Sequence, residues 1–172
     1  MILAARPPSE DHALIVVLTI TEGQVIISVM GSDERKFTII DHTADIGLRV
    51  RGETLERLFE NAAEAMLKIM VDVKDVSPME TIPIRLDGRD LEDLLVRWLG
   101  EVLYWFEGEQ KVTVRARIVS LTYGHLEAIL DTIPYSPEDH QVFCEIKAVT
   151  YHQISIIRKH HDLWEANVIF DV

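Results

Sequence analysis

Two stretches of helical hydrophobic period constrain the fold of this chain more than any other feature of its sequence. Apolar side chains recur every three to four positions in residues 55–70, and the pattern returns in residues 91–106. Such spacing gathers apolar side chains on one face of an α-helix. Thr54 and Asp90 stand where helix N-caps are expected, and Gly108 stands where the second helix should end. The sequence therefore predicts two amphipathic helices packed in a core.

The other clear period is two, which is typical of β-strands. It is plainest in residues 111–118, where Val112, Val114, Ala116 and Ile118 face one way. The expected strands are 37–40, 46–51, 82–86, 111–118, 121–130, 145–150, 153–157 and 163–170. No β-α-β alternation with a glycine-rich phosphate loop is present, so nucleotide binding of the Rossmann or P-loop type is not expected. The predicted class is α+β, with a mostly antiparallel curved sheet and both helices packed on one side.

The first 35 residues differ in character from the rest. The apolar stretch of residues 13–30 is almost long enough to span a bilayer, but Glu22, Gly23 and Gln24 interrupt it and acidic residues flank it. Dense valine and isoleucine on either side of this break favour a β-hairpin, so no membrane segment is expected. The polar stretch "MGSDERK" separates an N-terminal extension, residues 1–35, from a domain of residues 36–172.

Composition limits the classes of function. The chain has 172 residues, of which 48% are hydrophobic, enough for one domain with a core. Its 29 acidic and 17 basic residues give a net charge of −12, which opposes direct binding to nucleic acid and suits a basic partner or bound cations.

The single cysteine, Cys144, excludes an internal disulfide and a multi-cysteine zinc site, and its simplest role is that of a small apolar residue. A reducing, cytoplasmic setting is expected.

The stretch "DHTADIG", residues 41–47, concentrates polar groups between two expected strands. Asp41 and Asp45 offer carboxylate oxygens, which hard cations such as Ca²⁺ and Mg²⁺ prefer. Bonds from these aspartates to nearby backbone amides in a turn would explain them equally well. His42 is a weaker candidate ligand, and its expected role is a hydrogen bond in the core or at an interface.

The end of the sequence adds two more oxygen groups. Asp171 is the penultimate residue, so its carboxylate lies beside the α-carboxylate of Val172. Like charges this close repel each other unless they are solvated or bridged by a cation. If the last strand pairs with the strand that follows the opening motif, three carboxylates converge; a frayed, solvated terminus is the alternative.

Two further clusters have simpler explanations. The run "HHD" at 160–162 lies between expected strands and is read as a solvated turn. Lys147 and Tyr151 share one strand face, which would ordinarily be an exposed surface. No nucleophile elbow for Ser-His-Asp catalysis is present.

Taken together, "DHTADIGLRVRG", the following "TLERLFENAAEAM", "KAVTYH" and the ending "FDV" resemble the archease family over residues 37–172. The resemblance implies a non-enzymatic cofactor of the RtcB-type tRNA-splicing ligase, which promotes GTP-dependent guanylylation and multiple turnover in tRNA processing. It also implies a divalent metal site, usually assigned to calcium, that falls on Asp45, Asp171 and Val172. Asp41 and His42 would lie near that site, and Lys147 would assist partner contact or activation.

Two other classes of function stay open at this level. One is a stand-alone metal-dependent hydrolase using Asp41, His42, Asp45 and Asp171, which would need a deep pocket and an open metal position. The other is a general adaptor or chaperone for RNA-processing proteins. The N-terminal extension is not expected in the family, and it leaves the oligomeric state open.

Overall fold

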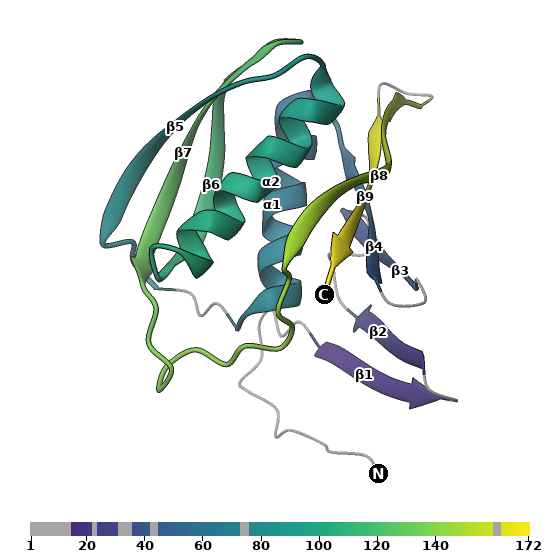
Figure 1. Ribbon diagram of the computed structural model, residues 1–172, viewed down its shortest axis with the longest axis vertical. Helices are drawn as coiled ribbons and strands as arrows, with labels where there is room; N and C mark the ends of the chain where they lie inside the picture. The colour runs from purple at the N-terminus through teal and green to yellow at the C-terminus, as the bar shows by residue number, and fades with distance from the viewer. Residues whose placement is uncertain (1–14, 22–23, 31–35, 42–44, 73–75, 160–162) are drawn as a thin grey trace.

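The computed structural model describes residues 15–21, 24–30, 36–41, 45–72, 76–159 and 163–172. Two helices and antiparallel strands make up these ranges, which confirms the predicted α+β class. The elements run in the order β1 (Ile15–Thr21), β2 (Gln24–Met30), β3 (Phe37–Asp41), β4 (Asp45–Gly52), α1 (Leu55–Met70), β5 (Glu80–Asp87), α2 (Leu91–Glu107), β6 (Lys111–Leu121), β7 (His125–Pro134), β8 (Ala148–Arg158) and β9 (Trp164–Asp171) (Figure 1).

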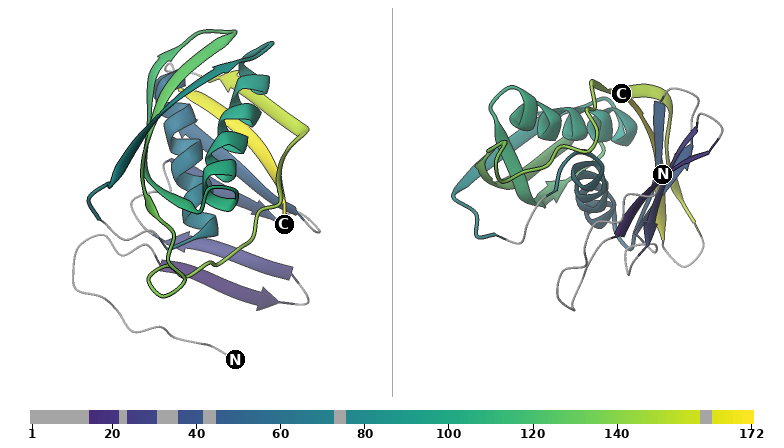
Figure 2. Two further views of the ribbon diagram at one scale, coloured as in Figure 1. Left: turned by 60° about the vertical axis from the view of Figure 1, so that its left-hand side comes forward. Right: turned by 90° about the horizontal axis from the view of Figure 1, so that it is seen from below.

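The helices lie between two antiparallel sheets. One sheet has the order β5-β7-β6 and the other β3-β4-β9-β8, while β1 pairs with β2. Helix α1 contacts β4 and β6, and α2 contacts β6 and β8, so each helix touches both sheets. The two further views show the same layering, with the helices enclosed (Figure 2). The core is therefore the space between the two sheets.

The helices are apolar on more than the face that the sequence pattern marks. The residues of the two expected apolar stripes are buried, except for Leu55, which is partly buried. Ala65, Ile69 and Val96 lie outside these stripes, and they are buried as well. A helix with apolar residues on several faces needs cover on several sides. This explains why the strands divide between two sheets that enclose the helices.

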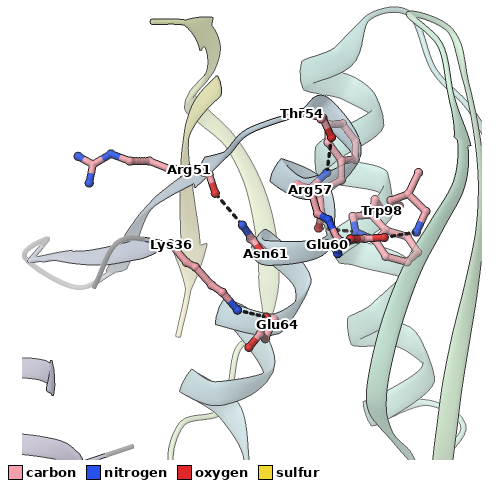
Figure 3. A network of polar contacts seen from close by, with 10 residues as sticks. Lys36, Arg51, Thr54, Arg57, Glu60, Asn61, Glu64 and Trp98 are labelled. Carbon is pink, nitrogen blue, oxygen red and sulfur yellow. Dashed lines mark hydrogen bonds and ion pairs between the residues drawn. The ribbon is translucent and has the colours of Figure 1, made fainter. Parts of the chain in front are cut away.

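Both helix starts are capped as expected. Thr54 Oγ1 accepts a hydrogen bond from the Arg57 amide at 3.1 Å, and Asp90 Oδ1 accepts one from the Asp93 amide at 2.8 Å. Between the helices, the buried Trp98 Nε1 donates to the Phe59 carbonyl at 3.0 Å (Figure 3). This bond satisfies a polar group that would be costly to bury alone.

Polar side chains tie α1 to both sheets. Asn61 Nδ2 donates to the Arg51 carbonyl of β4 at 2.8 Å (Figure 3). On the opposite side, Glu60 Oε1 accepts from the Ile118 amide of β6 at 2.9 Å. The Glu60 bond satisfies an amide on an edge strand, and together the two bonds fix the spacing of the layers.

Strand β8 departs from the expectation of two separate strands. It is one strand along the edge of the four-stranded sheet, and its pairing with β9 is interrupted. The register passes from Thr150 opposite Ile169 to Ser155 opposite Asn167, so extra residues bulge out of the ladder. Within the bulge, Gln153 has φ 51°, a left-handed conformation that is uncommon for a residue other than glycine.

Candidate cation and partner site

The structure brings Asp45 and Asp171 together at one end of the four-stranded sheet. Asp45 begins β4, Asp171 ends β9, and the two are direct register partners. Side chains of directly opposite residues lie on the same face with Cβ atoms about 5 Å apart. The two carboxylates therefore face each other, and such like-charged cross-strand pairs are unfavourable without a compensating charge.

Lys147 and Val172 join this pair. The Lys147 amide donates to the Asp171 carbonyl at 2.8 Å, and its Nζ donates to the main-chain oxygen of Val172 at 2.9 Å. The lysine is exposed, whereas Val172 is half-buried. Two carboxylates, a main-chain oxygen and an ammonium group thus meet where β4, β9 and the start of β8 lie side by side.

Other candidates are placed only partly or not at all. Asp41 ends β3 and is paired with Ile46, next to Asp45, but only its backbone is described. His42 lies outside the described residues, as does the run at 160–162. Their proposed roles stay predictions.

The oxygen groups suit a hard cation. Carboxylate and main-chain oxygens are the ligands that Ca²⁺ takes, with water completing its shell. Within the described ranges no three His, Cys, Asp or Glu side chains gather as a metal-binding group. A cation at Asp45, Asp171 and Val172 would therefore be coordinated by two side-chain carboxylates and one main-chain oxygen.

The sheet face that carries these aspartates becomes cationic farther along the strands. Arg49 Nε donates to Asn167 Oδ1 at 3.2 Å, and Arg51 Nε lies 3.0 Å from Glu165 Oε2. Burial raises the pKa of Glu165, but bonds from Arg51 and Lys159 outweigh burial and hold that pKa below its ordinary value. The face is therefore electrostatically polarised, with its anionic end at Asp45 and Asp171.

A cluster that the sequence did not reveal lies close along β8. Tyr151 donates its hydroxyl proton to Asp93 Oδ1 at 2.6 Å, although Asp93 is only 1% exposed in the first turn of α2. The sequence pattern singles out Asp90 as the start of this helix but not Asp93, and it places Tyr151 on an exposed strand face. The spacing of Asp90 and Asp93 does match a helix-capping pattern, but nothing in it indicates a tyrosine partner.

Two other features of the chain lie apart from the carboxylate pair. Cys144 is half-buried, and burial raises the pKa of its thiol, in keeping with the apolar role expected for it. A hollow of about 260 Å³ is lined by Phe106, Glu107, Gln110, Tyr135, Val142 and Glu145. Neither aspartate of the pair lines this hollow.

Neither helix of the described ranges is long and apolar enough to cross a membrane.

The fold defines a small α+β protein with two helices enclosed by antiparallel sheets. The sequence model of the Archease protein family (MTH1598/TM1083) matches residues 37–172. This chain belongs to that family, which confirms the resemblance indicated by its motifs.

Individual relatives agree with this assignment. The chain is 38% identical over 147 residues to Protein archease of Methanosarcina acetivorans, covering 83% of this chain and 100% of that protein. It is also 38% identical over 141 residues to Protein archease of Thermococcus kodakarensis, covering 80% and 99%.

Solved structures share the fold. The solution structure of protein 1598 of Methanobacterium thermoautotrophicum is 31% identical, with a TM-score of 0.67 over 80% of this chain and 99% of that one. A crystal structure from Thermotoga maritima, described as an archease and possible chaperone, has a TM-score of 0.55 at 22% identity over 77% of this chain and 94% of that one.

Proposed function

We propose that this chain is a non-enzymatic activator of an RtcB-type RNA ligase, promoting GTP-dependent guanylylation and repeated turnover in tRNA splicing. Membership of the Archease family supports a helper role rather than a catalytic one. The observation that carries the proposal is the direct pairing of Asp45 with Asp171, beside Val172 and Lys147.

A divalent cation, calcium in this proposal, would be held by Asp45, Asp171 and the main-chain oxygen of Val172. Where the chain ends at Val172, this oxygen belongs to an α-carboxylate and adds negative charge. Asp41 and His42 would lie near the site. The bound cation would offset the repulsion between the carboxylates and present positive charge to phosphate groups.

The chain's own residues prepare this surface. Lys147 holds Val172 through its ammonium group and holds Asp171 through its amide, so it fixes the strand end beside the carboxylates. Because Lys147 is exposed, part of its charge also faces a partner. The acidic character of the whole chain suits a ligase that presents a basic, RNA-binding face.

The geometry favours this function over a hydrolase. A hydrolase needs a pocket that holds substrate against an activated water. The paired aspartates instead lie at the end of a sheet. A site at a sheet end is suited to meeting another macromolecule.

The test is guanylylation of a cognate RtcB-type ligase by labelled GTP, with and without this chain. The activator predicts faster incorporation of label at amounts of the chain below those of the ligase. A general adaptor predicts binding to the ligase with an unchanged rate, and that result would refute the proposal.

A further inference from the structure

The motif Lys147–His152 contains residues that the proposed site does not use. Lys147 and Ala148 meet Asp171 at the site. The Thr150 hydroxyl donates to the Ile169 carbonyl at 3.0 Å and accepts from the His152 amide at 3.3 Å, which closes the regular part of the ladder. Only three register pairs, from residues 148 to 150, therefore hold the start of β8 against β9 before the bulge begins.

Tyr151 is the first residue of the bulge, and it reaches away from the sheet to α2. Its partner Asp93 also accepts bonds from the Arg89 amide at 3.0 Å and from Arg97 Nε at 3.0 Å, both on Oδ2. Oδ1 receives the Tyr151 hydroxyl at 2.6 Å and a longer contact of 3.4 Å from Arg89 Nη2. Asp93 is thus fixed by Arg97 of its own helix and by Arg89 just before that helix, and it offers one well-oriented acceptor to β8.

The far side of the bulge is attached to the same helical turn. The Ile156 amide donates to Glu92 Oε1 at 3.1 Å. The bulge is therefore bound to α2 on both sides, and between these bonds lies Gln153 with its left-handed backbone. A sparsely populated conformation persists where the surrounding contacts determine it, and these two bonds supply such contacts.

We infer that Tyr151 is a positioning residue: its bond to Asp93 fixes the path of β8 and thereby places Lys147 against Asp171 and Val172. The importance of that placement for activation rests on the proposed function, but the placement itself can be measured without the ligase. On this view, the first turn of α2 is part of the support of the site.

The test compares Tyr151→Phe with Tyr104→Phe. Both tyrosines donate to a carboxylate, Tyr104 to Glu109 Oε1 at 2.7 Å, and their exposed fractions are 51% and 52%. Tyr104 lies near the other end of α2, and its hydroxyl bonds to Glu109, which is not part of β8. The two variants therefore remove the same kind of hydrogen bond from equally exposed tyrosines, but at opposite ends of α2.

The measurement is hydrogen exchange of the Lys147 amide, followed by NMR together with the amides of the buried strand β7. Tyr151→Phe should raise the exchange rate of the Lys147 amide about tenfold, because β8 loses a hydrogen bond to a charged group that anchors it four residues farther along, and should change the β7 amides less than about twofold. Tyr104→Phe should leave Lys147 unchanged.

Two results would overturn the inference. One is an unchanged Lys147 exchange rate in Tyr151→Phe. The other is an equal rise at Lys147 and throughout β7, which would show that Tyr151 supports the whole fold rather than this position. Ligase assays of the same variants test the proposed function separately. If the wild-type chain does not stimulate the ligase, the proposed function fails, but the hydrogen-exchange result for Tyr151 is unaffected.

Discussion

At the scale of single residues, the facing carboxylates of Asp45 and Asp171 raise the question of what offsets their repulsion. Asp45→Asn keeps the size of the side chain and removes one charge. Without divalent cations, we expect the variant to be more stable than wild type by about 0.5 kcal/mol, because a like-charged cross-strand pair has been relieved. With millimolar Ca²⁺, the order should reverse, because only the wild type gains stability from binding.

Denaturant unfolding in chelator and in calcium measures both effects. Asp87→Asn is the control, because Asp87 also ends a strand but lies in the other sheet with its side chain 91% exposed. Equal responses of wild type and Asp45→Asn to calcium would contradict a cation site at Asp45.

Asp93 makes stability depend on pH. The bond from the Tyr151 hydroxyl, followed by those from Arg89 and Arg97, holds the pKa of Asp93 well below its ordinary value. A lowered pKa in the folded state contributes stability that is complete above the unfolded value of about 3.9 and is lost as pH falls toward the folded value.

Comparison of wild type with Asp93→Asn checks this dependence. The variant should be less stable by a constant amount above about pH 5, and the difference should narrow below about pH 4. Urea unfolding at several pH values gives both curves. A difference that stays constant down to pH 3 would show that the charge of Asp93 is not what stabilises the fold.

The residue scale also shows where sequence reasoning ends. The proposed roles of Asp45 and Asp171 follow from motif and resemblance, and the sequence predicts their pairing only on condition that the two strands pair. Tyr151 and Asp93 are 58 residues apart, and their bond depends on how β8 bends over α2. Neither residue carries a local pattern that encodes such a contact.

At the scale of elements, the hydrophobic period of the sequence predicted the features that depend on neighbouring residues, namely the two helices and their starts. The stripes around Phe59 and Trp98 specified both helices, and Thr54 and Asp90 specified where they begin. The division into two sheets and the continuous course of β8 depend on long-range pairing. A period of two reveals that strands exist, but it does not reveal their neighbours.

Gly52 marks a close approach between two elements. A Cβ atom there would lie 2.3 Å from the Leu58 amide nitrogen and 2.7 Å from its Cα, both main-chain atoms of α1. Gly52→Ala should therefore destabilise the protein by about 2 kcal/mol or more, because α1 would have to move away from β4.

Gly100→Ala is the matched control for that substitution. Gly100 lies within α2, and a Cβ atom there meets nothing within 4 Å, so the change should stabilise by about 0.5–1 kcal/mol. Thermal unfolding of both variants should give shifts of opposite sign. A Gly52→Ala variant as stable as wild type would contradict the close packing of α1 on β4.

At the scale of the whole molecule, the fold gathers charged groups at one end of the four-stranded sheet. Two sheets enclose the helices and bury the apolar residues, while Asp45, Asp171 and Lys147 lie at the end of the four-stranded sheet. The net charge of −12 adds a long-range attraction to basic surfaces. We therefore expect association with the proposed ligase partner to weaken as salt rises.

The most direct test of this account is the number of ligation cycles per ligase with GTP present. We predict several cycles with the wild-type chain and with Asp87→Asn, and about one without the chain or with Asp45→Asn, since the latter lacks half of the carboxylate pair. Full stimulation by Asp45→Asn would contradict the site, and no stimulation by the wild-type chain would contradict the function itself.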